Sequence, residues 1–282
     1  MRVDAWLRLA FLGQHPDRTF ALLERHGGAE GVIAAVERGD EDVGIALLDA
    51  EECHRRVARA GVSFDLAREA AWVTAFTHVV DAPAWLFRNG PLPPEPRVAI
   101  VGTRQCTEYG RRLALECAAA CAEAGWTVVS GLARGIDAAA HRGALAADGR
   151  TVAALGCGPD IRYPRQHASL RRRILDSGGA MVTEYPPGAS PLPWRFPPRN
   201  RIISGLSRAV VVVESAASGG SLSTAARAVI QNRTVFAIPG DVDRPASVGC
   251  NLLIRDGAVP VLGPDDLVEA LSLLTGAPRA TG

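Results

Sequence analysis

The sequence contains no lysine, so all 31 of its Lys or Arg positions are arginine. A Walker-type phosphate loop needs the triplet G-K-[ST], and this class of nucleotide site is therefore excluded. The sequence has no apolar run of about 18 residues and no C-x-x-C pair or Cys/His cluster, so neither a membrane span nor structural zinc is predicted. The N-terminus carries Asp4 and no small-residue cleavage site, which argues against a signal peptide. We expect a cytoplasmic protein with reduced cysteines, no metal and no cofactor.

The chain has enough apolar residues for a sizeable core. Hydrophobic residues make up 48% of its 282 positions, which allows one large or two small domains. The net charge is only +1, but nine arginines lie between Arg162 and Arg208, against the acids Asp176 and Glu184. A solvated helix face at 171–173 explains part of this run. The remainder favours a polyanionic partner.

The apolar pattern divides the chain into four segments. Helical spacing predicts a small all-α domain over residues 1–80. Residues 81–96 hold five prolines and are expected to form a linker or an extended strap. Over residues 97–275, helical patterns alternate with apolar strands, which are expected at 98–101, 126–130, 151–155, 180–183, 209–213 and 234–238. This alternation predicts an α/β fold with a Rossmann-like, doubly wound, mostly parallel sheet, followed by a tail at 276–282.

The loops after the predicted strands are rich in glycine and hydroxyl residues. In RVAIVGTRQCTEYG, a buried strand is followed by Gly102, Thr103 and Arg104 and then by a helix. The carboxyl ends of parallel strands meet at one edge of the sheet, where such loops let a phosphate backbone approach closely. An arginine beside the N–H groups of a helix N-terminus favours an anion. The alternative, that Gly102 only tightens the turn and Arg104 is solvated, stays open.

Catalytic motifs are weak in this sequence. The GCG triplet at 156–158 lacks the third glycine of the dinucleotide fingerprint, because Ile161 stands there. Neither a G-x-S-x-G elbow nor H-E-x-x-H occurs. Asp137 and His141 are four residues apart on a predicted helix, and Ser130 precedes them. A Ser/His/Asp triad is therefore an alternative to a purely structural Asp–His pair, which is the more common arrangement.

Over residues 83–270, the chain resembles the DNA-processing protein DprA (Smf) family. The resemblance is carried in order by VAIVGTRQCTEYG, SGLARGIDAAAH, LGCGPDIRYPRQH, TEYPPG, FPPRNRIISGLS, VVVVESAASGGSLSTA and FAIPGDVDRPASVGCNLLI. It implies an extended Rossmann domain preceded by a helical SAM-like domain. It also implies a single-stranded DNA-binding protein, not an enzyme, that protects incoming DNA in natural transformation and helps load the recombinase RecA. A homodimer through the Rossmann domain is implied as well. Many members continue into a winged-helix domain, which this sequence does not show before Gly282.

The resemblance also indicates the binding residues. The arginine of the family's V-G-[ST]-R turn falls on Arg104, and the basic residue after Y-P falls on Arg165; in the family these positions line a phosphate pocket. We therefore expect the two arginines to share one pocket, which Asn200 and Arg201 extend as a groove. The expected DNA- or phosphate-binding residues are Gly102, Thr103, Arg104, Ser130, Gly131, Gly156, Gly158, Arg165, Asn200, Arg201, Ser218, Gly219, Ser221 and Thr224.

A nucleotide-directed protein is the alternative. Related Rossmann proteins, the lysine-decarboxylase-like nucleotide phosphoribohydrolases, cleave an N-glycosidic bond with the carboxylate of a P-G-G-x-G-T-x-x-E loop. Here SGGSLST occupies the similar place, and Arg227 stands where the glutamate would be. The missing carboxylate argues against hydrolysis. A module that senses a small nucleotide in the same pocket is a third interpretation.

Overall fold

The computed structural model describes residues 2–67, 73–76 and 78–275, so the expected tail at 276–282 lies outside the described residues. The N-terminal part consists of helices α1 (Arg2–Phe11), α2 (Pro16–His26), α3 (Ala29–Arg38) and α4 (Ala50–Ala60). Their apolar faces form one buried cluster that includes Leu7 and Val32. Trp85 and Phe87, from the proline-rich segment, complete this cluster. The N-terminal helices therefore pack directly on the segment that was expected to form a linker or strap.

The described residues form one sheet of nine strands in the order β1-β2-β6-β5-β4-β3-β7-β8-β9. The strands are β1 (Ser63–Leu66), β2 (Trp85–Asn89), β3 (Arg97–Val101), β4 (Thr127–Ser130), β5 (Thr151–Ala154), β6 (Ala180–Thr183), β7 (Ala209–Val212), β8 (Thr234–Ala237) and β9 (Val259–Pro260). In the order of the sheet, all neighbours from β6 through β5, β4, β3, β7 and β8 to β9 pair in parallel. Strand β2 pairs antiparallel with both β1 and β6. The mostly parallel α/β sheet predicted from the sequence is confirmed.

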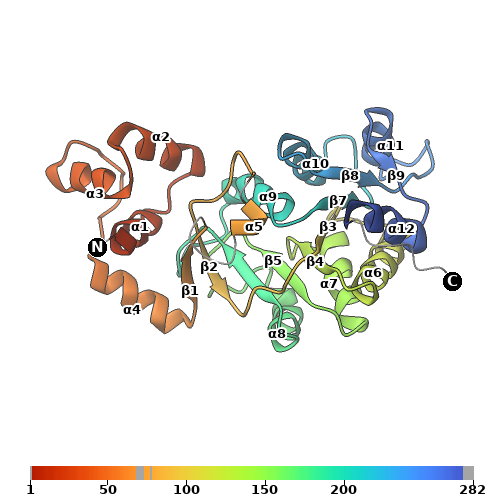
Figure 1. Cartoon of the computed structure of the whole chain (residues 1–282), viewed down its shortest axis with the longest axis horizontal. Helices are drawn as coiled ribbons and strands as arrows, with labels where there is room; N and C mark the ends of the chain where they lie inside the picture. Colours follow the sequence, from red (N-terminus) through yellow and green to blue (C-terminus); the bar gives the residue numbers. More distant parts are fainter. Residues whose placement is uncertain (1, 68–72, 77, 276–282) are drawn as a thin grey trace.

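Helices cover both faces of the sheet (Figure 1). One face carries α5 (Val73–Phe76), α9 (Phe196–Gly205), α10 (Gly220–Ile230) and α11 (Val248–Arg255), and its core includes Val212 and Ile203. The other face carries α6 (Glu108–Glu123), α7 (Ile136–Ala146), α8 (Ala168–Asp176) and α12 (Pro264–Thr275), and its core includes Ile100 and Cys117. Strands buried on both faces explain the unbroken apolar runs in the sequence.

Three short strands, β1, β2 and the two-residue β9, were not among those predicted. Residues 63–66 lie in the region predicted as all-α, but they form strand β1, in which Phe64 pairs with Phe87 of β2. Residues 85–89 form β2, which pairs with both β1 and β6. The long-range pairing decides both assignments, since four or five residues carry too little periodicity to distinguish a strand from a helix or a loop. No helix within the described ranges is both long and apolar enough to cross a membrane.

The chain reverses its direction of travel across the sheet beside β3. From β3 it proceeds through β4, β5 and β6 on one side, and it then returns to add β7, β8 and β9 on the other. Doubly wound sheets bind ligands in the crevice at the carboxyl ends of the strands next to such a reversal. The loops after β3, β4 and β7 are therefore expected to form the functional site.

Candidate functional site

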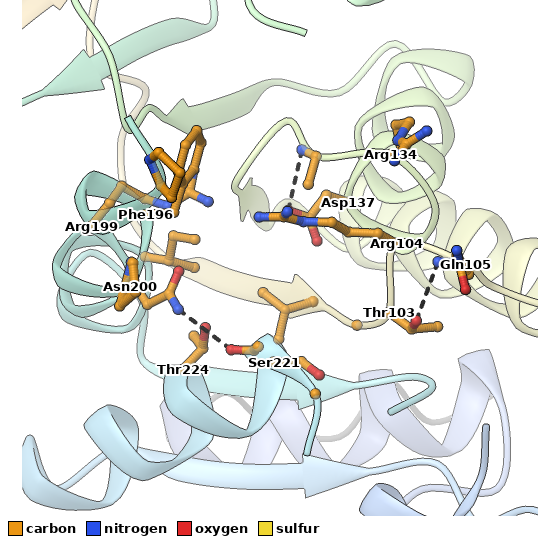
Figure 2. A pocket seen from close by; sticks show the side chains of 18 of the residues that line it. Thr103, Arg104, Gln105, Arg134, Asp137, Phe196, Arg199, Asn200, Ser221 and Thr224 are labelled. Carbon is orange, nitrogen blue, oxygen red and sulfur yellow. Dashed lines mark hydrogen bonds between the residues drawn. The ribbon is translucent and has the colours of Figure 1, made fainter. Parts of the chain in front are cut away.

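A cavity of about 620 Å³ lies at this reversal, and we call it the main cavity. It is lined by the turn after β3, the loop between β4 and α7, the start of α9 and the start of α10 (Figure 2). Seven of the predicted binding residues line it: Gly102, Thr103, Arg104, Asn200, Gly219, Ser221 and Thr224. The topology has thus brought together loops that are more than one hundred residues apart in the sequence.

The Arg104 side chain extends across the main cavity toward Phe196 and Arg199 of α9 (Figure 2). Its position is fixed through the preceding residue. The amide of Thr103 donates to the Glu214 carbonyl at 2.8 Å, and the Thr103 carbonyl accepts from the Ile136 amide at 3.2 Å. The exposed Arg104 therefore sits on a turn that is held from both sides, which limits the entropy lost when its guanidinium binds an anion.

The Glu214 side chain also holds the segment between β3 and α6. Its buried carboxylate accepts from the Thr107 amide at 2.9 Å and from the Thr107 hydroxyl at 2.5 Å. Glycine is required at two positions because of this close packing. A Cβ at Gly102 would lie 2.5 Å from Ile136 Cγ1 and 2.8 Å from the Glu214 carbonyl oxygen, and one at Gly110 would lie 2.2 Å from the Glu214 carboxylate. Gly102 is thus required for the close packing of this turn against Ile136 and Glu214 as well as for the turn itself.

Arg199 lines the main cavity, although it is not among the residues predicted from the sequence. It is only 4% exposed, and its Nη1 donates to the Gly131 carbonyl at 2.8 Å and to the Ala154 carbonyl. Its Nε has no hydrogen-bond partner among the described residues. Burial lowers the pKa of this guanidinium, and the nearby Asp137 charge opposes that shift. Arg199 thus adds a buried positive charge beside the main cavity, which favours an anion there.

Asp137 is the only carboxylate in the lining of the main cavity among the described residues. It accepts from the Gly131 amide at 3.1 Å and from the Ala133 amide at 3.4 Å, so it orders the loop that leads into α7. Burial raises the pKa of this carboxyl, and Arg199 acts in the opposite direction. With Arg104, Arg134 and Arg199 against one aspartate, the cavity has a formal surplus of two positive charges. Figure 2 shows Arg134 pointing away from the centre.

An aromatic pair closes one side of the main cavity. The Tyr163 and Phe196 ring centroids lie 5.6 Å apart. The guanidinium carbons of Arg104 and Arg199 lie 5.6 Å and 5.8 Å from the centre of the Phe196 ring. Tyr163 is 41% exposed, which leaves part of its ring accessible. A flat ligand with an attached anion can contact rings and guanidinium groups here at the same time.

Three helices begin at the main cavity, and none has a side-chain cap. They are α7, whose N-cap is Gly135, α9, whose N-cap is Arg195, and α10, whose N-cap is Gly219. By contrast, α6 is capped by the Thr107 hydroxyl, which accepts from the Gly110 amide at 3.1 Å. The positive ends of the α7 and α10 dipoles therefore add to the arginine charges. Helix α9 adds no such donors, because Pro197 and Pro198 have no N–H and the Phe196 amide donates to the Pro193 carbonyl. This combination favours a phosphate or another oxyanion.

A second, smaller cavity of about 50 Å³ adjoins the main one. The two cavities share Arg104, Ala133, Arg134, Tyr163 and Phe196, so the aromatic pair separates them only in part. The smaller cavity is also lined by Gly131, Gly156 and Pro164. Two more predicted residues, Gly131 and Gly156, thus lie beside the main cavity rather than in it.

The remaining predicted residues line neither cavity. Ser130 is fully buried and its hydroxyl donates to the Ile100 carbonyl at 2.7 Å. Arg201 is also buried, with Nη2 paired to the Glu184 carboxylate at 2.5 Å. The expectation that Arg201 extends the groove is therefore wrong, because α9 turns this side chain toward the interior. The amide of the buried Gly158 donates to the Ala189 carbonyl at 2.8 Å, and Ser218 is exposed on the loop before α10.

Arg165 lies outside both cavities. It is exposed on the short helix η1 (Arg165–His167), directly after Pro164 of the smaller cavity. The prediction that Arg104 and Arg165 share one pocket is therefore wrong, since the loop after β5 carries Arg165 past the aromatic pair. Arg199 takes the place beside Arg104 instead.

The structure does not assemble a Ser/His/Asp triad. Ser130 and Asp137 bond to backbone groups, as described above, and the His141 Nδ1 lies 2.7 Å from the Thr151 hydroxyl. Because that hydroxyl donates to the Val128 carbonyl, it must accept from His141 Nδ1–H. His141 is therefore a structural residue. All six cysteines are unpaired, and within the described ranges no group of His, Cys, Asp or Glu could hold a metal ion.

Four residues of the main cavity were not predicted from the sequence: Arg134, Tyr163, Phe196 and Arg199. Each was adjacent to a selected motif: Phe196 and Arg199 belong to FPPRNR, and Arg134 belongs to SGLARG. The signal was an arginine or aromatic residue in or beside one of the loops that carry the predicted residues. The direction of each side chain could not be read from that signal, because it depends on the packing of α9 and α7 on the sheet.

Comparison with known proteins identifies relatives of this chain. The family model for DNA recombination-mediator protein A matches residues 64–272. The chain is 45% identical over 193 residues to Protein Smf of Escherichia coli strain K12, which covers 68% of this chain and 52% of that protein. It is 39% identical over 290 residues to the putative DNA processing protein DprA of Mycobacterium tuberculosis, with coverage of 94% and 74%. The chain thus spans about half the length of the first relative.

Solved structures share the fold. The X-ray structure of DNA processing protein A from Streptococcus pneumoniae matches with a TM-score of 0.75 and 30% identity, over 93% of this chain and 95% of that one. DNA processing protein A from Helicobacter pylori, in a study of its single-stranded DNA binding mode, matches with a TM-score of 0.63 and 25% identity, over 78% and 99%. Both matches extend well beyond the loops of the main cavity.

Proposed function

The chain belongs to the DNA recombination-mediator protein A family, and on that basis we propose that it binds single-stranded DNA, protects incoming DNA during natural transformation and helps load the recombinase RecA onto it. The main cavity binds the strand. The observation that carries this proposal is the meeting of the uncapped N-termini of α7 and α10 with Arg104 and Arg199 in one cavity. These are the groups that a backbone phosphate prefers.

The aromatic pair gives the proposed site a second component. A phosphate between Arg104 and Arg199 places the adjoining nucleotide near Tyr163 and Phe196, where a base can stack. Every base has an aromatic face, so stacking discriminates little between sequences. Contacts to phosphates carry no sequence information either. The proposed binding is therefore largely independent of sequence.

We further propose that the protein does not catalyse a reaction. Asp137 is occupied by two backbone amides, and Arg227, which stands where the phosphoribohydrolases have their glutamate, pairs with Asp81 at 3.3 Å instead. Nucleoside monophosphate hydrolysis thus has no evident general base among the described residues of the cavity. The nucleotide-binding alternative predicts tight binding of a free nucleotide, and incubation with nucleoside monophosphates tests both alternatives.

A homodimer in the cytoplasm is part of the same proposal. The apolar residues of the C-terminal helix α12 divide into two groups. Leu267 and Leu271 belong to the core, whereas Leu273 is 64% exposed on α12. The edge strand β9 adds the exposed Val259. These exposed apolar groups support an interface on the Rossmann part of the chain, which sedimentation at several protein concentrations would test.

The direct test is a titration of fluorescent oligo-dT at several salt concentrations, with the parent and with Arg104→Glu. We expect Arg104→Glu to lower the affinity at least tenfold at low salt, because it replaces an attractive charge by a repulsive one. Thermal unfolding of both proteins should coincide, since Arg104 is exposed. A folded Arg104→Glu protein that binds oligo-dT like the parent would exclude the main cavity as the binding site.

A further inference from the structure

Beyond the smaller cavity, the surface is strongly basic. Pro164, at the far end of that cavity, is followed by η1 and then by α8. Four exposed arginines, Arg162, Arg165, Arg172 and Arg173, lie along this stretch, and we call them the α8 basic face. From residue 161 to residue 175 the sequence contains no acid. The positive charge therefore begins at the rim of the smaller cavity and continues down the side of the molecule.

The packing of α8 explains which of its arginines are available. Leu170 and Ile174 face the core, which turns Arg172 and Arg173 outward. Arg171 is different, because its Nη1 donates to the Ile161 carbonyl at 3.0 Å and so holds the loop before η1. We therefore leave Arg171 out of the α8 basic face.

Another exposed helix of the same chain shows how the protein neutralises arginines elsewhere. On α4, Arg55 pairs with Glu51 at 2.5 Å and Arg56 pairs with Glu52 at 2.7 Å, each in i,i+4 spacing. On α8, the one comparable pair is Arg172 with Asp176, at 3.9 Å. The arginines of α8 and the loop before it therefore have fewer nearby acids than those of α4, which favours a polyanion on this surface.

We propose that the α8 basic face is a second contact region for the single strand, which leaves the main cavity past Tyr163 and Pro164 and then follows η1 and α8. This inference rests on the proposed function, because it assumes that a nucleotide occupies the main cavity. From Arg165 to Arg173 the helical rise amounts to about 13 Å, which adds room for further phosphates. The partner is thus a strand longer than the main cavity can hold.

The test compares two lengths of oligo-dT, of about four and about sixteen nucleotides, the two ends of the usual range of site sizes. The test variant is the triple substitution Arg162→Ala, Arg172→Ala and Arg173→Ala. We expect its affinity for the long oligonucleotide to fall about tenfold at low salt, and its log-log salt dependence to flatten by about two units, at about 0.7 for each phosphate that the variant no longer binds. Its affinity for the short oligonucleotide should equal that of the parent.

Two comparison variants make the result decisive. Arg38→Ala with Arg59→Ala removes exposed helical arginines from the N-terminal part and should leave both affinities unchanged. Arg104→Glu should weaken both lengths. If the triple variant binds the long oligonucleotide as the parent does while Arg104→Glu is impaired, the α8 basic face is only solvated and this inference is wrong. Equal weakening for both lengths would also contradict it. If Arg104→Glu weakens neither length, the proposed main cavity itself is wrong.

Discussion

At the scale of single residues, the charges that shape the main cavity lie mostly beneath its surface. Arg199, Asp137 and Glu214 are all buried, and each is bonded to backbone groups of the surrounding loops. Breaking such a buried interaction leaves a charge without a partner and costs several kcal/mol. Arg104 and Arg134 are the exposed exceptions, and of the two it is Arg104 that extends across the cavity. The buried charges therefore build the site, and the exposed Arg104, whose replacement should leave the fold intact, is the residue to test for binding.

Arg104 and Arg165 should differ in their effect on single-stranded DNA. Arg104→Ala removes a phosphate-binding group inside the main cavity, so the affinity should fall for every oligo-dT length and the log-log salt slope should flatten by about 0.7. Arg165→Ala acts outside both cavities and should weaken only oligonucleotides long enough to pass η1. A fluorescence titration with short and long oligonucleotides distinguishes the two. Equal weakening for the short oligonucleotide would show that they share a pocket after all.

His141 should make stability depend on pH. Burial lowers its pKa from 6.5 to about 3, and the charges of His167, Arg199 and Arg142 act in the same direction. Below pH 6.5 the unfolded chain therefore takes up a proton that the folded chain refuses, so folding is weakened as the pH falls. The free energy of unfolding should lose about 1.4 kcal/mol per pH unit from this group between pH 6.5 and 3.

The matched control for this pH dependence is His141→Gln, which cannot titrate. In urea unfolding between pH 7.5 and 5, the free energy of unfolding of the parent should fall relative to that of His141→Gln as the pH falls. A constant difference between the two unfolding free energies across that range would contradict the assignment of His141 as a buried neutral residue.

At the scale of elements, the turn between β3 and α6 connects the sheet to the main cavity. The turn is clamped by Glu214 at the end of β7 and by Ile136 at the start of α7. Gly135 belongs to the same junction: a Cβ there would lie 2.3 Å from the Thr103 carbonyl oxygen, and its φ of +77° favours glycine. Three elements therefore meet within van der Waals distance around Thr103. The position of Arg104 is a property of this junction rather than of its own loop.

Gly102→Ala should test the junction. The added Cβ would overlap Ile136 and the Glu214 carbonyl, so the backbone has to shift. We expect the protein to lose about 1–3 kcal/mol of stability, measured by chemical unfolding, and to bind oligo-dT less tightly because Arg104 is displaced. Gly263→Ala is the control, since nothing lies within 4 Å of its added Cβ. Unchanged stability and unchanged oligo-dT affinity in Gly102→Ala would show that the turn can accommodate a Cβ and would contradict this prediction.

At the scale of the whole molecule, the order of strands places the site. Because β7 returns to the side of β3, the loops after β3 and β7 become neighbours, and α9 closes the cavity between them. The predicted division of the chain at residues 80, 96 and 275 stays a prediction. The structure shows that the sheet takes one strand, β1, from before residue 80 and the others from after it.

The shape of the molecule predicts a preference for single over double strands. The main cavity is bounded by narrow loops and by an aromatic pair, which a flexible strand can enter and whose rings an unpaired base can contact. Competition between oligonucleotides of matched length should therefore favour the single strand. Equal affinities for the duplex and the single strand would contradict this prediction.

Much of the fold was determined by the sequence alone. The six central strands were found within one or two residues, because residues buried on both faces produce unbroken apolar runs that need no knowledge of the partner strand. The position of Arg104 directly after the first of these runs could likewise be predicted from the neighbouring sequence alone. The short strands β1, β2 and β9 were not predicted, since their identity comes from pairing with neighbouring strands.

Only the tertiary structure decided which polar side chains face the cavity. Arg199 and Arg201 are two residues apart in FPPRNR, yet one lines the main cavity and the other pairs with Glu184 in the interior. A motif gives the types of residue, but the rotation of α9 against the sheet sets their directions. The same holds for Arg165, which a single proline separates from Tyr163 at the cavity. Charge and spacing are local properties of the chain, whereas a shared pocket depends on long-range packing.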